Sequence, residues 1–571
     1  MSKEFMRHSV SFFVASMAVA WGSQASAQNT SPVTVTPETL RPESGGKGFR
    51  VEIPEAGGIV PPAGAEGLSV QLATATLEGG FAEVAGQSEA ILARLRGQRV
   101  TLAQVYAAAS AVEAAHARAG FVLARVAVPP QDLHDGGGLR ITVIDGFIES
   151  IDVAGLPSRV RDAVAGRTAK LKGQRHLRLG DIEQPLLIAN EIPGLTLRST
   201  LMRGSETGGT KLVLEGKHQL VSGSLSIDNQ LDSSLEDWSV TAQISLNSAL
   251  GLGEQIYGFV ASGYDVSQIF SDNARERVLG GGMVLPLGDG RLTLNPEVTF
   301  SRTRPIPSAN VPQTIGKLRR LTLRAGYTFI RTRARGLVLN GAIEQIDESN
   351  NIPQFALVFS RDRYMAGRLG LSYDSVSASG GSWGVSAQIS KGLGNLGAIT
   401  VAEALAANVG FSRDGAGLNF TKLTGQARGN WALAKNIDLR LSAKGQTGFG
   451  DPLFRAEQFS MEGSDGVSAF VGGVTAVDEG LVARAELGGR VAAGKDSVIA
   501  PYVFAAGGTG AIKQHTVLEP GHLKVAAFGG GARVNLAKYR LYLGVEYAHG
   551  ISDLAKIDKA DRVNVSVTVR F

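Results

Sequence analysis

The chain contains no cysteine and, beyond its amino terminus, no long hydrophobic run. The absence of cysteine excludes disulfides and thiolate metal sites, so the fold does not depend on an oxidising compartment. The eight histidines are scattered without the His-x-x-Glu-His spacing of a zinc site, and neither metal nor cofactor is expected. A membrane-spanning helix needs about twenty consecutive apolar residues, and nothing after the amino terminus offers them.

Charged and aromatic residues are also few. They make up 19% and 6% of the 571 residues, whereas glycine occurs 73 times. This composition suits a membrane β-barrel, whose strands are apolar on one face only, but a large secreted β protein would have a similar composition. The formal net charge of +5 is too small to argue for nucleic acid as a partner.

The amino terminus has the features of a secretory signal peptide. Lys3 and Arg7 form a positive region, residues 10–21 are apolar, and a small-residue cleavage site of the A-x-A type ends at Ala27. We therefore expect residues 1–27 to be removed and the exported chain to begin at Gln28.

Residues 28–66 show no sustained periodicity. They are rich in proline, glycine, serine and threonine, a composition that predicts a flexible linker. Only Pro37–Leu40 has the beginning of a helical pattern, so no long helix that would plug a pore is expected here.

Residues 67–217 repeat one order of elements, strand–helix–helix–strand–strand, in two units, 67–145 and 146–217. In the first unit Thr101 and Gln104 form a capping box at the start of the second helix. The expected elements of the first unit are strands at 68–73, 121–128 and 139–144 with helices at 81–95 and from 101. Those of the second are strands at 147–153, 195–202 and 211–214 with helices at 158–171 and 181–191. From the pattern alone, two generic small α+β domains remain an alternative.

Residues 218–571 contain repeated alternating segments broken by Gly, Asn, Asp and Ser. The last nine residues alternate without exception. Successive strand side chains point to opposite faces, so one row meets lipid and the other lines water, although an ordinary edge strand could alternate as well. The apolar row is Val563, Val565, Val567, Val569 and Phe571, and the polar row is Asn564, Ser566, Thr568 and Arg570.

We therefore expect a mainly β membrane protein: a C-terminal transmembrane antiparallel β-barrel preceded by two α+β domains of the order βααββ. The length of the barrel region allows about sixteen strands. The terminal Phe571 resembles the signal by which the outer-membrane assembly machinery recognises barrel proteins.

A family resemblance rests on stretches 119–133 (AGFVLARVAVPPQDL) and 138–146 (GLRITVIDG). They resemble the POTRA domain of two-partner secretion transporters, the TpsB group of haemolysin secretion proteins of the ShlB/FhaC/HecB kind, and 192–201 resembles the second POTRA domain of that family. The resemblance implies that POTRA domains recognise an unfolded client, by lending a sheet edge to an extended segment. The strand expected to bind the client carries Val122, Leu123, Arg125, Val126 and Val128.

The barrel region resembles the same family at its start and at one long loop. Residues 224–229 (SLSIDN) and 246–254 (LNSALGLGE) resemble the first strand and the first turn, with Glu254 in place of the usual Asp. In the family a loop folds back into the pore, and its Val-Arg-Gly-Tyr/Phe tip pairs with an acidic group on the inner wall. The corresponding positions here are Gly463, Val467, Ser468, Ala469 and Phe470.

Ser468 thus replaces the family arginine and Ala469 replaces glycine. Asp478, Glu479 and Gly480 resemble the acidic element of the wall, whose acids would lack that partner. Either another base such as Arg484 serves, or the loop is held differently. A buried carboxylate without a partner is costly, so a solvated position is expected for these acids.

The resemblance implies an outer-membrane transporter of a Gram-negative bacterium. The expected partners are one secreted exoprotein client (TpsA-like), the barrel assembly machinery and outer-membrane lipid, with no nucleic acid, and we expect a monomer. The alternative is an assembly factor of the same superfamily that inserts other barrels. A barrel enzyme is not expected, because the chain has no G-x-S-x-G elbow and no histidine beside a plausible nucleophile.

Overall fold

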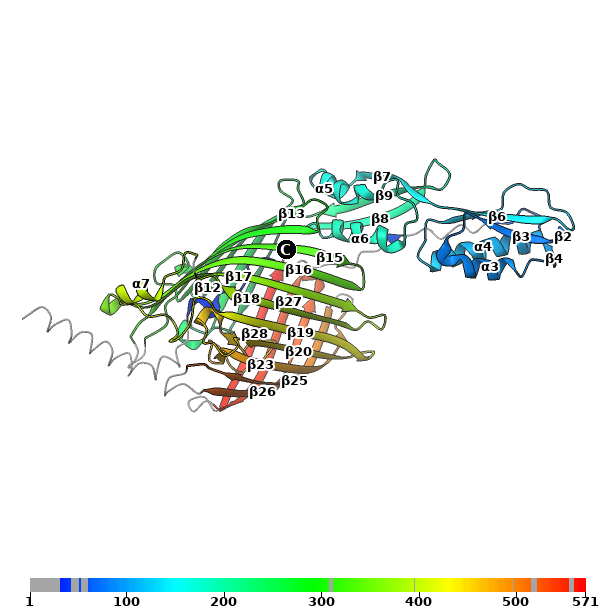
Figure 1. Ribbon diagram of the computed structural model, residues 1–571. Coiled ribbons are helices and arrows are strands. Elements are labelled where there is room, and N and C mark those ends of the chain that lie inside the picture. Colours follow the sequence, from blue (N-terminus) through cyan, green and yellow to red (C-terminus); the bar gives the residue numbers. More distant parts are fainter. Residues whose placement is uncertain are drawn as a thin grey trace, which may run out of the picture.

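The computed structural model describes residues 31–42, 51–52, 60–307, 312–394, 396–494, 497–514, 521–553 and 559–571. The predicted signal peptide and its cleavage site at Ala27 and Gln28 lie outside these residues. Two small α+β domains project from one end of a large β-barrel, and a short helix marks the opposite end (Figure 1).

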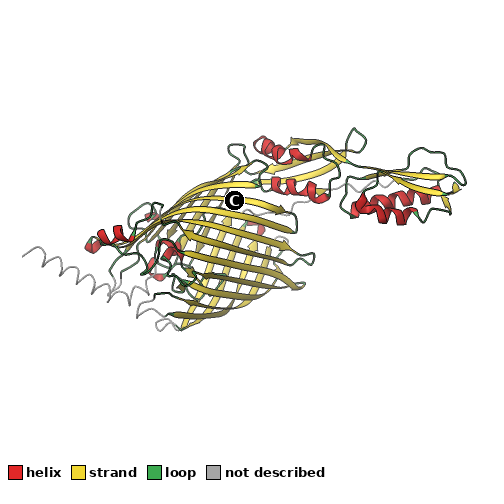
Figure 2. Ribbon diagram, in the orientation of Figure 1, coloured by secondary structure: helices red, strands yellow, loops and turns green. Residues whose placement is uncertain are grey.

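The first domain packs two helices against a three-stranded sheet of order β3-β6-β5 (Figure 2). Thr101 and Gln104 form the predicted capping box at the start of α4. The strand predicted at 68–73 is β2, which pairs with β4 beside the sheet, whereas β3 and β4 were not predicted. The elements are β2 (Ser69–Gln71), β3 (Thr74–Glu78), α3 (Ala85–Leu92), β4 (Arg99–Thr101), α4 (Leu102–Arg118), β5 (Arg125–Ala127) and β6 (Gly138–Ile144).

The second domain repeats this arrangement with a core of its own. Its sheet has the order β1-β8-β9-β7. Strand β1 (Val51–Glu52) comes from the predicted linker and pairs in parallel with the edge of β8. The other elements are β7 (Phe147–Gly155), α5 (Ser158–Thr168), α6 (Leu179–Asn190), β8 (Leu195–Arg203) and β9 (Gly209–His218).

The barrel has sixteen antiparallel strands in the described residues, with β24 continuing β23. The predicted fold class is confirmed. The strands are β10 (Val221–Asp228), β11 (Ser239–Asn247), β12 (Gln255–Gly263), β13 (Glu276–Leu287), β14 (Leu292–Thr303), β15 (Ile315–Arg331), β16 (Arg335–Ile352), β17 (Leu357–Val376), β18 (Ser382–Gly392), β19 (Thr421–Ala434), β20 (Ile437–Thr447), β23 (Glu479–Gly489), β24 (Val491–Ala492), β25 (Ser497–Ala511), β26 (His522–Leu536), β27 (Leu541–Ser552) and β28 (Lys559–Arg570).

Three further elements belong to connecting segments. A short helix, α7 (Val401–Ala406), lies between β18 and β19, and a small hairpin, β21 (Phe459–Ser460) with β22 (Ala476–Val477), lies between β20 and β23. Helix α2 (Pro32–Val35) precedes both domains. None of the helices in the described part of the chain has the length and apolar composition needed to span a bilayer.

The last strand closes the barrel by pairing with β10. The backbone N–H of Phe571 donates to the carbonyl of Gly223 (3.0 Å), and the N–H of Gly223 donates back (3.1 Å). The ring of Phe571 lies so close to Gly223 that a Cβ there would be 2.5 Å from it. Asn229 adds two hydrogen bonds to the closure, because its side-chain amide donates to the carbonyl of Val563 and accepts from the N–H of Val565.

Deleting Phe571 removes both backbone hydrogen bonds to Gly223 and the terminal aromatic ring. We expect less heat-modifiable barrel in the outer membrane, as measured by gel shift of membrane fractions, whereas Phe571→Tyr retains these contacts and should insert normally. Equal amounts of folded barrel for the deletion and the unaltered chain would contradict a role for Phe571 in assembly.

Candidate functional site

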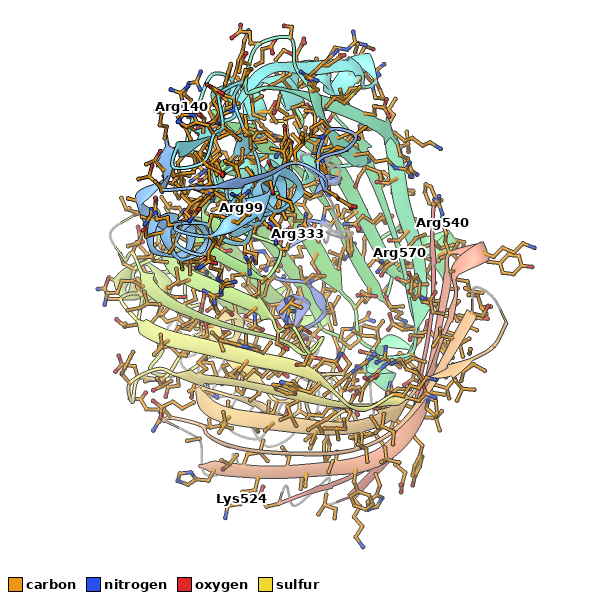
Figure 3. All side chains as sticks on the ribbon, turned by 90° about the vertical axis from the view of Figure 1, so that its right-hand side faces the viewer. Arg99, Arg140, Arg333, Lys524, Arg540 and Arg570 are labelled. Atoms are coloured by element: carbon orange, nitrogen blue, oxygen red, sulfur yellow. The ribbon has the colours of Figure 1, made fainter. Side chains whose placement is uncertain are left out.

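The barrel lumen is lined by polar and charged side chains and is occupied by two segments of the chain itself. One is the connection of residues 448–478 between β20 and β23, here called the inward loop. The other is residues 31–42, here called the lumen segment, which is drawn in blue within the ring of strands in the end-on view of Figure 3. Seen from the domain-bearing end, Arg570 on β28 and Arg540, in the turn before β27, lie at the rim.

The inward loop is anchored near its start by Glu457, a fully buried carboxylate. Its oxygens accept hydrogen bonds from the guanidinium of Arg368 on β17 (2.8 and 3.0 Å) and from the hydroxyl of Tyr364 (2.8 Å). The ammonium of Lys422 on β19 lies 2.8 Å from the same carboxylate. Because removing one partner of a buried pair typically costs about 3–5 kcal/mol, this anchor fixes the loop firmly.

The end of the loop is anchored by Asp478, which is also fully buried. Its carboxylate accepts hydrogen bonds from Arg413 (3.1 Å) and from the backbone N–H groups of Lys513 (2.7 Å) and Leu453 (3.1 Å). The expected solvated position is therefore wrong for Asp478, because these donors offset its desolvation. Glu479 forms an ion pair with the side chain of Lys513 (2.9 Å).

The tip of the loop meets a different set of wall residues. The Ser468 hydroxyl donates to Glu546 on β27 and accepts a hydrogen bond from Arg484 on β23 (2.9 Å). Arg484 also forms ion pairs with Glu546 and with Glu486 (2.9 Å). Asn564, from the polar row of the last strand, donates to the carbonyl of Ser468 (2.9 Å). The guanidinium is thus on the wall rather than on the loop.

The tip of the loop also makes apolar contacts with the wall. Val467, Ala469 and Phe470 are buried and belong to one cluster with residues of β23, β25 and β26. Gly550 on β27 provides the space, since a Cβ there would lie 2.7 Å from the Ala469 methyl. Gly463 has a positive φ of 102°, a conformation that favours glycine, in the turn before the tip.

The predicted acidic partners and the predicted loop tip are therefore not together. Asp478, Glu479 and Gly480 lie at the end of the loop, where β23 begins, whereas Ser468 contacts Glu546 and Arg484. Of the two possibilities left open by the sequence, another base does serve these acids, but it is Arg413 for Asp478 and Lys513 for Glu479. Arg484 contacts the tip and Glu546 instead.

The strand predicted to bind the client is only partly available. Leu123 is buried in the core of the second domain, so it joins the two domains. Arg125, Val126 and Ala127 form the edge strand β5. However, the N–H of Val126 donates to the side chain of Glu113 on α4 (2.9 Å). Val122 and Val128 flank this strand and are half-buried.

A second contact joins the two domains around His176. Its ring lies 4.4 Å and 4.6 Å, between centroids, from the rings of Phe81 and Phe121. Its Nε2 is 3.1 Å from a carboxylate oxygen of Glu83, which also accepts a hydrogen bond from Arg178 (3.2 Å). The hydrogen bond from His176, followed by smaller contributions that include Arg178, lowers the pKa of Glu83 to about 2.

The lumen segment corrects a further prediction. A flexible linker was expected over residues 28–66, but residues 31–42 are bound along the inner wall and residues 51–52 form strand β1. Ser31, Pro32, Thr36 and Leu40 are buried. The expectation that no long helix plugs the pore is consistent with α2, which has only four residues.

Several wall residues that hold the loop were not singled out by sequence reasoning: Arg368, Lys422, Arg413, Glu486, Glu546 and Arg533. Arg533 makes a two-pronged contact with Glu486 (2.8 and 2.9 Å). A usable signal existed for five of them, because they alternate with apolar or small residues on long strands and so face the lumen. Arg413 instead lies in the connection between α7 and β19.

The comparisons with known proteins agree with this architecture. The model of the family "Haemolysin secretion/activation protein ShlB/FhaC/HecB" matches residues 208–534, and that of the ShlB-type POTRA domain matches residues 75–146. The first match covers more than half of the chain, and the chain belongs to this family.

Individual relatives share less sequence. The outer membrane transporter CdiB of Escherichia coli is 27% identical over 230 residues, which are 40% of this chain and 37% of that transporter, so the match spans little more than a third of the relative's length. The solved structure of CdiB from E. coli has a TM-score of 0.67 at 18% identity and covers 100% of this chain and 99% of that one. The structure of CdiB from Acinetobacter baumannii has a TM-score of 0.59 at 14% identity and covers 88% of this chain and 90% of that one.

The two structures show that the fold is shared. The family and its relatives are outer-membrane transporters, and the barrel with its outward apolar row lies in the outer membrane. The roles of individual loop and wall residues in this chain remain predictions.

Exchanging Arg484 tests whether the wall guanidinium holds the loop tip. Arg484→Ser leaves the buried Glu546 without its cation, at a cost of about 3–5 kcal/mol, so the loop should leave its seat more often. We expect more frequent opening in planar bilayers. The double variant Ser468→Arg, Arg484→Ser returns a guanidinium to the same carboxylates from the loop side and should restore the closed state.

Ser468→Arg alone is the informative control, because it places two guanidinium groups side by side and should open the pore rather than close it. Identical gating of the unaltered chain and the Arg484→Ser variant, with both correctly inserted, would show that Arg484 does not hold the tip.

Proposed function

We propose that this protein exports one unfolded exoprotein from the periplasm through its barrel. The observation that carries the proposal is that segments of the chain itself occupy both places that a client would need. Residues 51–52 pair as a strand with the open edge of β8, and residues 36–42, which follow helix α2 and are not helical, lie in the lumen. Both surfaces thus accept polypeptide through its backbone.

The edge of β8 is the better candidate for client capture. An unpaired edge offers backbone N–H and C=O groups to any extended chain, so recognition does not require a particular side-chain pattern. On β5, by contrast, the N–H of Val126 is already bonded to Glu113. A client would exchange with the two residues of β1 and thereby enter the sheet of the second domain.

One experiment in cells distinguishes the two candidate functions, export of an exoprotein and assembly of other barrels. The gene for this chain is deleted, and both the exoproteins in the medium and the other outer-membrane barrels are quantified. An exoprotein that is lost from the medium is the client. We expect the exoprotein to disappear from the medium while the other barrels stay constant. A normal exoprotein level with a fall in other barrels would instead identify an assembly factor.

The role of the β8 edge in client capture is tested by joining β1 to β8 with a disulfide. The chain has no cysteine, so Glu52→Cys with Thr200→Cys introduces a single possible pair, at positions that are partners in the register. We expect the oxidised double variant to insert normally but to lose secretion, and reductant to restore it. Either single variant serves as the matched control.

Undiminished secretion by the locked form would exclude the β8 edge as the capture site. The β5 edge would then be tested with Val126→Pro, which removes the N–H donor of that strand.

A further inference from the structure

The lumen segment is bound mainly through its backbone. Wall side chains from β11, β14 and β15 reach three of its carbonyls and one of its N–H groups, here called the lumen track. The contacts are Arg320 to the carbonyl of Pro37, Arg324 to that of Glu38 (2.7 Å), Gln243 to that of Leu40 (2.7 Å), and the N–H of Leu40 to Glu297 (3.0 Å). Backbone contacts of this kind are available to any extended polypeptide.

The wall also recognises one apolar side chain of the segment. Leu40 is 1% exposed and packs with Tyr257, Val284 and Phe259 on the inner wall. Gly280 on β13 makes room for it, because a Cβ there would lie 2.6 Å from a Leu40 methyl group. The wall therefore contains a shaped pocket for a single aliphatic side chain.

The side chains of Pro37, Glu38 and Thr39, between these contacts, are exposed, although the wall holds the backbone of Pro37 and Glu38. Of the three side chains, that of Thr39 donates a hydrogen bond to Glu297 (3.1 Å). Substituting them would leave three wall-to-carbonyl hydrogen bonds in place. The track can therefore bind segments of many different sequences, provided that each has an aliphatic side chain for the pocket.

Contacts within the wall hold Glu297 in place. One of its oxygens accepts hydrogen bonds from Tyr257 (2.7 Å) and from the N–H of Leu40, and the other forms an ion pair with Arg324 (3.0 Å). In the described part of the chain, the buried hydroxyls of Thr299 and Thr322, beside these residues on β14 and β15, have no hydrogen-bond partner. They are spare groups for a peptide of different sequence.

We propose that the lumen track is a binding site for non-helical polypeptide and recognises the backbone and one aliphatic side chain. At rest it holds residues 37–40, and during transport it holds successive segments of the client. The identity of this second occupant rests on the proposed export function, whereas the peptide-binding property of the track does not.

The test uses the full chain in planar bilayers. Leu40→Asp puts a charge into the apolar pocket and should release the segment, raising the conductance. A synthetic peptide of residues 31–42, added on the domain side, should then block the pore. A second peptide with residues 33–39 permuted, but Pro32 and Leu40 kept, should block at a similar concentration.

A third peptide carrying Leu40→Asp should need about tenfold or more to block, since burial of one leucine side chain corresponds to at least that factor. On the wall side, Val284→Phe in the Leu40→Asp chain fills the pocket and should abolish block by both leucine-containing peptides. Met283→Phe is the matched control, because the neighbouring position on the same strand faces outward.

Three outcomes would overturn the proposal: block by the native peptide but not by the permuted one, block by neither peptide, or an unchanged conductance of the Leu40→Asp chain. These measurements contain no client, so their failure leaves the export proposal untouched.

The second occupant is tested in secreting cells with a photo-reactive amino acid at position 322, which faces the track, and at position 323, which faces lipid. An adduct with the exoprotein at 322 alone is expected. Its absence during active secretion would exclude the client as an occupant of the track.

Discussion

The structure depends on the need to pair every backbone polar group that crosses the bilayer. A sheet with a free edge would leave unpaired N–H and C=O groups in hydrocarbon, so the last strand returns to the first and the ring closes. Closure in turn fixes which side chains face inward. Sixteen strands enclose a wide lumen, and half of their side chains must be polar, charged or covered.

Two segments of the chain itself cover part of the inner wall. The inward loop brings Glu457 and Asp478 to guanidinium and ammonium groups of the wall, and the lumen segment brings main-chain carbonyls to Arg320 and Arg324. Buried charges in the lumen are thereby compensated from two directions. The lumen segment is attached to the wall by hydrogen bonds and one small apolar contact, so it can be exchanged for another chain more readily than the inward loop, which buried ion pairs hold.

Much of the fold was predictable because local signals agreed with the global arrangement. The alternation of Val563 to Phe571 and the capping box at Thr101 are local features, and both agree with the structure. Contacts such as Arg368 with Glu457 join residues 89 positions apart and have no local signature. The lumen segment resembled a linker for a related reason: it is held by its backbone, so its side chains follow no period.

The position of Arg484 has an energetic consequence for opening. An arginine carried by the loop takes its charge away when the loop departs, and the wall carboxylate is left behind uncompensated. Here the cation stays in the wall with Glu486 and Glu546, and only the Ser468 hydroxyl leaves. Releasing the tip therefore breaks a few neutral or singly charged hydrogen bonds and separates no buried ion pair, whereas the ion pairs of Glu457 lie nearer the start of the loop. The seat stays neutralised and ready for the loop to return.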